Sequence, residues 1–181
     1  MIYMTHRSLP ILFAMLPLLA CAQLACAQGH GNRVSPHETV SVDLKGDKIT
    51  ISYGRPYLKG RKLDDIEAYG KVWRLGADEA TKLTVTTKTR IGDSLELEPG
   101  SYSLFAMAGA DKWTIIVNRV ADQWGAFSYK QSDDLGRFDV PVKQGSPVEQ
   151  FTISLTKQSD SAATLSFAWG DTSVSTAVKP M

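Results

Sequence analysis

The stretch that decides the fold class of this chain runs Ser101-Tyr102-Ser103-Leu104-Phe105-Ala106-Met107, then Gly109-Ala110-Asp111, then Trp113-Thr114-Ile115-Ile116-Val117. Two runs of alternating or β-branched residues flank a turn in which glycine supplies a positive φ. Large aromatic side chains inside such runs are most simply part of a hydrophobic core. The pattern is typical of antiparallel strands joined by tight turns.

The same pattern recurs on both sides of this stretch. Alternating or β-branched runs occupy residues 39–44, 48–53, 82–87, 101–107, 113–117, 138–142, 151–156, 164–169 and 173–178. Turn chemistry separates several of them, as at Lys45-Gly46-Asp47, Ile91-Gly92-Asp93, Pro99-Gly100 and Gly170-Asp171. Nine short strands of this kind predict an all-β protein, a single antiparallel β-sandwich over residues 39–178.

The remaining segments are less regular. Only residues 63–69 show a helical pattern, and Gly70 would end it, so we expect one short helical turn there. Residues 28–38 and the tail after Val178 lack periodicity and are expected to be loose. Residues 144–147, Gln-Gly-Ser-Pro, are expected to form a loop.

Residues 1–27 have the three parts of a secretory signal peptide: a short basic start, an apolar run over 9–20, and small residues near the end. Cleavage after Ala27 or Ala22 would release a soluble periplasmic or secreted protein. Leu18-Leu19-Ala20-Cys21 also resembles a lipobox, in which Cys21 would carry a lipid anchor. Both outcomes stay open, and such an anchor is the one membrane association that we expect.

Charge and reactive side chains exclude several classes of function. Without Arg7, the 20 Lys and Arg fall to 19 and equal the 19 Asp and Glu, which gives no steering toward nucleic acid. Both cysteines, Cys21 and Cys26, lie in the export region. The histidines are His6, His30 and His37, all before residue 39, so a triad or multi-histidine metal cage inside the domain is not expected.

One metal motif depends on processing. Cleavage after Ala27 would expose Gln28-Gly29-His30, whose amine, amides and imidazole suit square-planar Cu(II) or Ni(II). Any other N-terminus removes that arrangement. We therefore expect neither a metal nor a cofactor in the function of the protein.

The densest polar cluster is Val72-Trp73-Arg74-Leu75-Gly76-Ala77-Asp78-Glu79-Ala80-Thr81, with Tyr53-Gly54-Arg55-Pro56 upstream. An Arg and two acids beside glycine could hold a polar ligand or could lock a loop to the sandwich by ion pairs. The lock is the slightly favoured interpretation.

Two further segments carry candidate ligand contacts. Arg55, Lys59, Arg61 and Lys62 could hold an anion, or could be solvated charges that are balanced by Asp64, Asp65 and Glu67. Trp124 lies in a polar setting near Tyr129, where its ring could stack on a sugar or seal one end of the sandwich. The candidate ligand-binding residues are therefore Arg55, Trp73, Arg74, Asp78, Glu79, Trp124 and Tyr129.

These blocks, together with Lys59-Gly60-Arg61-Lys62, Tyr69-Gly70-Lys71, Pro99-Gly100-Ser101-Tyr102-Ser103-Leu104-Phe105 and Asp122-Gln123-Trp124-Gly125-Ala126-Phe127-Ser128-Tyr129, resemble a bacterial exported family catalogued as domain of unknown function family 2911. The resemblance covers nearly all of the chain beyond the signal peptide. It implies export and a single-domain layout. It assigns no catalytic residue.

Three functional hypotheses follow. The first is a non-catalytic envelope module whose loop residues bind a small polar ligand, a glycan or an envelope protein. The second is a histidine-free hydrolase or lyase in which Asp78 or Glu79 is the base and Arg55 or Arg74 holds an anionic substrate. The third is a structural envelope protein, which an exposed apolar patch or an unpaired edge strand would indicate.

Overall fold

The computed structural model describes Met1, residues 33–66 and residues 69–181. Residues 2–32, which hold nearly all of the predicted signal peptide, both cysteines and the predicted metal motif at residues 28–30, lie outside the described residues. Within the described part, no helix has the length and apolar character needed to cross a membrane.

The described residues form strands with one helical turn and one 3-10 turn. The bounds are β1 His37–Leu44, β2 Asp47–Gly54, α1 Leu63–Ile66, β3 Val72–Trp73, β4 Thr81–Val85, β5 Thr89–Ile91, β6 Leu95–Leu97, β7 Gly100–Met107, β8 Lys112–Asn118, η1 Gln131–Asp133, β9 Asp134–Pro141, β10 Lys143–Ser159 and β11 Ala162–Pro180. The predicted all-β class is confirmed, and the short helical turn predicted for residues 63–69 corresponds to α1, which covers residues 63–66.

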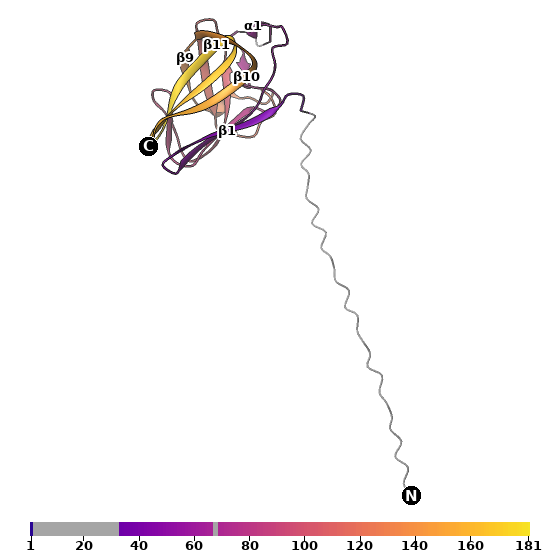
Figure 1. Ribbon diagram of the computed structural model, residues 1–181, viewed down its shortest axis with the longest axis vertical. Coiled ribbons are helices and arrows are strands. Elements are labelled where there is room, and N and C mark those ends of the chain that lie inside the picture. The colour runs from indigo at the N-terminus through magenta and orange to yellow at the C-terminus, as the bar shows by residue number, and fades with distance from the viewer. Residues whose placement is uncertain (2–32, 67–68) are drawn as a thin grey trace. The chain divides into compact units, whose positions relative to one another are not determined.

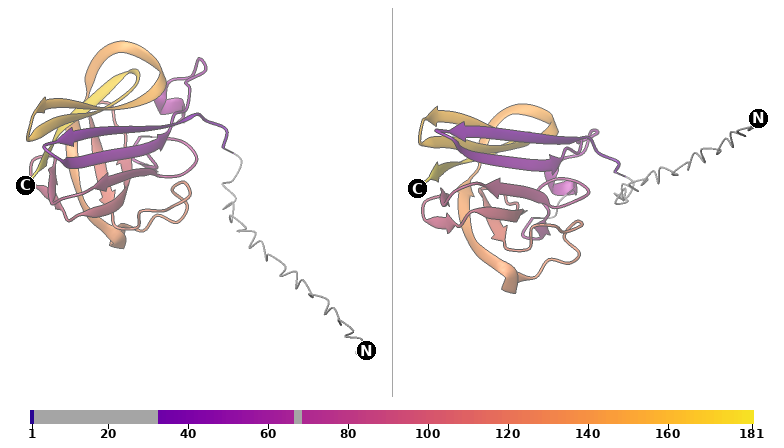
Figure 2. Two further views of the ribbon diagram at one scale, coloured as in Figure 1. Left: turned by 60° about the horizontal axis from the view of Figure 1, so that its bottom comes forward. Right: turned by 90° about the horizontal axis from the view of Figure 1, so that it is seen from below.

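The strands form two antiparallel sheets. One has the order β1-β2-β4-β7-β8-β9, with β3 paired to β7, and the other has the order β10-β11-β5-β6. The stretch from Ser101 to Val117 forms the hairpin of β7 and β8, in which Phe105 lies opposite Ile116. Strands of both sheets surround a common interior, and β10 and β11 run together as a long pair across the molecule (Figures 1 and 2). The predicted sandwich is thus confirmed.

The interior is centred on aromatic rings from both sheets. Trp73 stacks on Trp169 with ring centroids 5.6 Å apart, and it meets Trp113 and Phe151 edge-on at 5.8 and 5.1 Å. Each of these four side chains is at most 2% exposed. Since β3 contributes only two residues, the burial of Trp73 is the main reason that this short strand is fixed.

Several local predictions were wrong. The expected turn at Gly170-Asp171 and the expected loop at 144–147 both lie inside the long strands β10 and β11. The register shifts between Gln144 and Val148, so extra residues bulge opposite Gly170 and the hairpin bends there without ending. The strands β3, β5 and β6 were not predicted, because runs of two or three residues carry no periodic signal.

Both ends of the domain are held more tightly than expected. Strand β11 pairs with β5 to Pro180, and the Met181 N–H donates to Lys88 O at 2.8 Å. His37 begins β1 and pairs with Gly54, so a histidine does belong to the domain. Of the segment expected to be loose, residues 28–32 lie outside the described residues and residues 33–38 make the contacts given below.

Candidate functional site

The block around Tyr53 and Arg55 joins the two sheets. The Tyr53 hydroxyl accepts the N–H of Ile153 in β10 at 2.9 Å and lies 2.9 Å from the Glu38 carboxylate. The Arg55 guanidinium donates to Phe151 O at 3.2 Å and lies 3.0 Å from Glu38. These side chains satisfy backbone groups on the edge of β10, so Arg55 is committed to the sandwich.

The block from Val72 to Thr81 is a tight corner packed against Gly54. Leu75 and Asp78 have φ values of 54° and 64°, in the left-handed region that side chains other than glycine seldom adopt. The Thr81 hydroxyl donates to Leu75 O at 2.5 Å, and the Trp73 indole donates to Gly76 O at 3.1 Å. Its crowded composition therefore reflects a strained turn that is fixed by its own side chains.

The two acids of this corner hold the segment that precedes β1. Asp78 lies 3.1 Å from the His37 imidazole and accepts the backbone N–H of Ser35 at 3.4 Å. Glu79 forms an ion pair with Arg33 and lies 3.6 Å from His37. Burial is the largest single influence and would raise the pKa of the Glu79 carboxyl, but the hydrogen bond from Arg33, a backbone hydrogen bond and the nearby charges of Arg33 and His37 together lower it.

Trp124 and Arg74 lie on the outer side of this corner. Trp124 is 44% exposed and forms a backbone bridge with Glu79, and the Gly125 N–H donates to Asp78 O at 3.0 Å. A Cβ atom at Gly125 would come within 2.9 Å of the Arg74 guanidinium, so Arg74 lies directly against this loop.

Tyr129 lies in a different network. Its hydroxyl donates to Asp134 at 2.8 Å and accepts a hydrogen bond from Arg137, while its ring meets Phe105 at 5.0 Å. Burial, and next Asp134, raise the pKa of Tyr129 to about 12. Ala126 and Tyr129 pack on a small second core that contains Phe105, so the segment between β8 and β9 is anchored to the outer face of the first sheet.

The structure thus brings together only part of the predicted set. Asp78, Glu79 and Trp124 are neighbours, and Arg74 adjoins them through Gly125. Trp73 lies in the core, Arg55 reaches β10 and Tyr129 packs on the second core. Among the described residues no ion pair or side-chain hydrogen bond joins Arg55 or Arg74 to Asp78 or Glu79.

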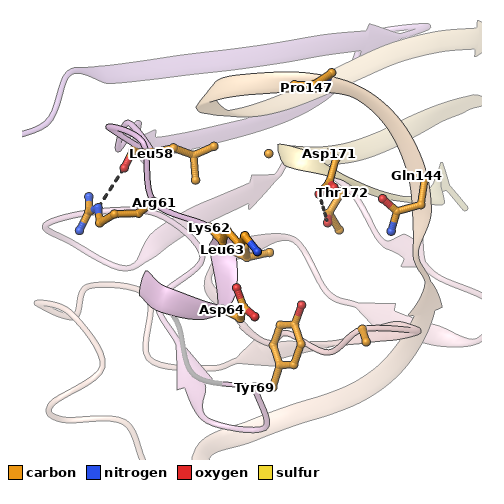
Figure 3. Close-up of a pocket in the computed structure, with 12 residues that line it drawn as sticks. Leu58, Arg61, Lys62, Leu63, Asp64, Tyr69, Gln144, Pro147, Asp171 and Thr172 are labelled. Carbon is orange, nitrogen blue, oxygen red and sulfur yellow. Dashed lines mark hydrogen bonds between the residues drawn. The ribbon is translucent and has the colours of Figure 1, made fainter.

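A polar cavity lies elsewhere, between the α1 region and the bend of β10 and β11 (Figure 3). Its volume is about 460 Å³. One wall consists of residues around α1, which are Leu58, Arg61, Lys62, Asp64 and Tyr69. The opposite wall comes from the bulge and the bend, with Gln144, Pro147, Gly170, Asp171 and Thr172.

A second depression of about 440 Å³ adjoins this cavity, because Tyr69 and Ala110 line both. The second depression is also lined by Met107, Lys112 and Thr114. Tyr69 is 48% exposed. We call the two depressions together the Tyr69 groove.

Most polar side chains of the groove are available to a ligand. Arg61 donates to the carbonyls of Leu58 and Tyr57 at 2.9 and 3.3 Å and so stiffens its own loop. Within the described part of the chain, the side chains of Lys62, Asp64 and Gln144 form no hydrogen bond. These three groups are polar contacts that the cavity offers without breaking a hydrogen bond.

The protonation state of Tyr69 follows from its surroundings. Burial, and next the negative charges of Asp64 and Asp171, raise the pKa of its hydroxyl. At neutral pH the hydroxyl therefore stays protonated and can donate a hydrogen bond to a ligand.

The sequence identified the cations of this groove and Asp64 as a charge that could balance them, but it did not identify the residues of the facing wall or Tyr69. Arg61 and Lys62 belonged to the predicted cationic loop, whereas Tyr69, Gln144 and Asp171 were assigned to a helix end, a loop and a turn. The sequence feature that could have indicated this wall is a pair of facing irregular positions in two long strands, with Gly145 and Pro147 in β10 and Gly170 in β11. No group of three potential ligands suited to a metal ion occurs in residues 33–66 and 69–181.

Comparison with known proteins extends the sequence resemblance. The model of a family described as protein of unknown function (DUF2911) matches residues 35–178. The matched segment contains the corner, the sheet contacts of Tyr53 and Arg55, and the lining of the Tyr69 groove. No curated protein and no solved structure matches the chain.

Proposed function

Because the chain belongs to the family of unknown function DUF2911, whose description states no activity, we propose a function from geometry. The protein is a non-catalytic module of the bacterial envelope that binds an uncharged oligosaccharide in the Tyr69 groove. The observation that carries this proposal is that two depressions, of about 460 and 440 Å³, meet at one half-exposed tyrosine ring.

Shape favours a ligand longer than one sugar ring. Volumes of this order are typical of small-molecule sites, and two that share a wall suit a chain of linked units. An aromatic ring at the junction offers an apolar face for a sugar ring, with its hydroxyl at the edge for a polar contact. Tyr69 has this position.

Charge favours a neutral ligand over the anion considered from the sequence. In the cavity Arg61 and Lys62 are balanced by Asp64 and Asp171. A phosphate or sulfate would meet two carboxylates there, which is unfavourable. Sugar hydroxyls both donate and accept hydrogen bonds, so they can use Lys62 and Gln144 as donors and Asp64 as an acceptor.

The location in the envelope rests on the sequence. The signal-peptide pattern of residues 1–27 supports export, by either soluble release or anchoring at Cys21. Glycans are abundant in that compartment. Export and an elongated groove whose cavity charges are balanced therefore support the same class of ligand.

Titration calorimetry with a panel of neutral and acidic oligosaccharides tests the proposal. We expect Tyr69→Ala to weaken binding by about tenfold, because roughly 1.5 kcal/mol of aromatic contact is lost. Tyr69→Phe should retain most of the affinity, since it keeps the ring. The matched control is Tyr57→Ala, which removes another exposed tyrosine outside the cavity lining.

Two results would overturn this function. One is binding that Tyr69→Ala leaves unchanged. The other is a preference for acidic sugars or phosphates that Lys62→Ala removes. If new reducing ends appear during the same titrations, the protein hydrolyses the oligosaccharide and the proposed non-catalytic function is wrong.

The arginine-assisted enzyme considered from the sequence has no supporting geometry. Asp78 and Glu79 are engaged by His37 and Arg33, and Arg55 pairs with Glu38. The pKa of the Glu79 carboxyl is lowered, which makes it a weaker general base, and the Asp78 carboxylate already contacts His37 and the Ser35 N–H. We therefore base no reaction on the corner.

A further inference from the structure

The segment between β8 and β9 presents unusually exposed apolar side chains. Phe127 is 86% exposed and Trp124 and Val120 are each 44% exposed, while Val34 near the start of β1 is 84% exposed. We call these four residues the Phe127 patch. Single exposed apolar residues are ordinary, but a group of them that includes two aromatic rings indicates a contact surface.

Backbone and side-chain contacts place most of the patch at one end of the domain. Trp124 pairs with Glu79, Glu79 binds Arg33, and Val34 is the next residue in the chain. The Phe127 ring lies against Gly125, where a Cβ atom would come within 3.0 Å of it. Val34, Trp124 and Phe127 therefore surround the corner that holds the N-terminal segment.

The patch stands on a fixed support. Two residues after Phe127, Tyr129 packs on the second core and donates a hydrogen bond to Asp134 at 2.8 Å. The Ala80 N–H donates to Gln123 O at 2.9 Å, which ties the segment to β4. Phe127 is thus held out in water by an ordered loop, so burying it elsewhere costs little conformational entropy.

We propose that the Phe127 patch rests on a lipid bilayer, with Phe127 and Trp124 in the headgroup region. Trp124, which has an apolar ring face and a polar N–H, favours that layer, and the apolar Phe127 ring can be buried at its boundary with the acyl chains. Arg119 and Lys130 flank the aromatic residues and are exposed, and neither forms an ion pair within the described residues. Cations in this position suit anionic headgroups.

The short sequence distance between Cys21 and the patch supports a lipid bilayer as the partner of the patch. Arg33, beside the patch, joins the domain to the segment that carries the lipobox-like Cys21, 12 residues earlier. Twelve residues span at most about 40 Å. Lipid attached at Cys21 would therefore keep the membrane within reach of this end of the domain, and one acyl chain alone anchors weakly without a second contact.

The four tryptophans make a direct test possible. Trp73, Trp113 and Trp169 are at most 2% exposed, so a lipid-dependent change in emission reports Trp124. The processed protein is mixed with phosphatidylethanolamine and phosphatidylglycerol vesicles, with or without lipids brominated in the acyl chains. We expect a blue shift of the emission and quenching by the brominated lipids.

A variant series distinguishes insertion from simple attachment. Phe127→Ser should raise the lipid concentration at half-maximal change by roughly tenfold, because the burial of one aromatic side chain is lost. Since Phe127 is exposed, this variant is expected to fold, and near-ultraviolet circular dichroism checks that it does. Tyr57→Ser removes an exposed aromatic outside the patch and should leave the titration unchanged.

The proposal is overturned if vesicles leave Trp124 emission unchanged or if Phe127→Ser titrates like the unsubstituted protein. Sedimentation equilibrium without lipid tests the competing explanation, which is that the patch joins two copies of the chain. A dimer that Phe127→Ser dissociates would assign the patch to a second copy of the chain, not to a membrane.

Discussion

Gly54 illustrates how single residues set the geometry of the corner. A Cβ atom at this position would lie 2.2 Å from the carbonyl oxygen of Ala77, which is backbone and cannot swing aside. We expect Gly54→Ala to destabilise the protein by about 2–4 kcal/mol, because the corner must shift away from β2. Urea unfolding followed by tryptophan fluorescence measures the change.

Gly145 provides the matched control for this substitution. No atom lies within 4 Å of its Cβ position, and its φ is outside the left-handed region. Gly145→Ala should therefore change the free energy of unfolding by less than about 0.5 kcal/mol. Equal effects of the two substitutions would mean that the contact of Gly54 with Ala77 is not what requires glycine.

At the residue scale the sequence predicted where the unusual chemistry lies but not its partners. The cluster around Asp78 was interpreted from the sequence as either a ligand site or a lock, with the lock slightly favoured. Its contacts with Arg33 and His37 cross more than 40 positions, and the bond between Tyr53 and Ile153 crosses 100. Such pairs depend on how strands align, which no local pattern reveals.

At the element scale, alternation predicted the strands that have one buried face. Strands β1, β2, β4 and β7 were each located to within a few residues. The prediction failed where length or continuity mattered. A glycine inside a long strand has the same local signature as a glycine in a turn, so Gly170 was interpreted as the end of a strand.

The bend at Gly170 can be tested through its backbone. Gly170 has a φ of 62°, so Gly170→Ala should cost about 1 kcal/mol, whereas Gly170→Asn should cost less because asparagine tolerates this region better. Leu58 lies 3.8 Å from the Cβ position, which leaves room for either side chain. Denaturant unfolding of both variants measures the difference. Equal losses would indicate a packing conflict and not backbone strain.

At the scale of the whole molecule, the Tyr69 groove could not be predicted from local sequence. Its walls come from residues near 58–69, from the turn at Ala110, and from the facing bulge and bend of β10 and β11. None of these segments is unusual by itself. The groove exists because the long hairpin bends over the α1 region, and that arrangement follows from the pairing of both sheets (Figures 1 and 3).

The stability of the whole domain should fall in alkaline solution. Burial raises the pKa of Tyr53 to about 12, and burial together with Asp134 raises that of Tyr129 to about 12. An unfolded tyrosine has a pKa of about 10. Between about pH 10 and 12 the native state therefore holds more protons than the unfolded state, so stability falls as pH rises. Below pH 10 both states keep these protons and the contribution is fully present.

Each of these two tyrosines can lower the free energy of unfolding by up to about 1.4 kcal/mol per pH unit in that range. Tyr53→Phe and Tyr129→Phe should each make the decline between pH 10 and 12 shallower, although Tyr53→Phe also loses its hydrogen bond with Ile153 and starts from a lower stability. The slope of stability against pH is therefore the informative quantity. Unfolding curves at several alkaline pH values measure it, with Tyr57→Phe as the exposed control. A slope that neither buried substitution changes would show that ionisation of Tyr53 and Tyr129 is not coupled to unfolding.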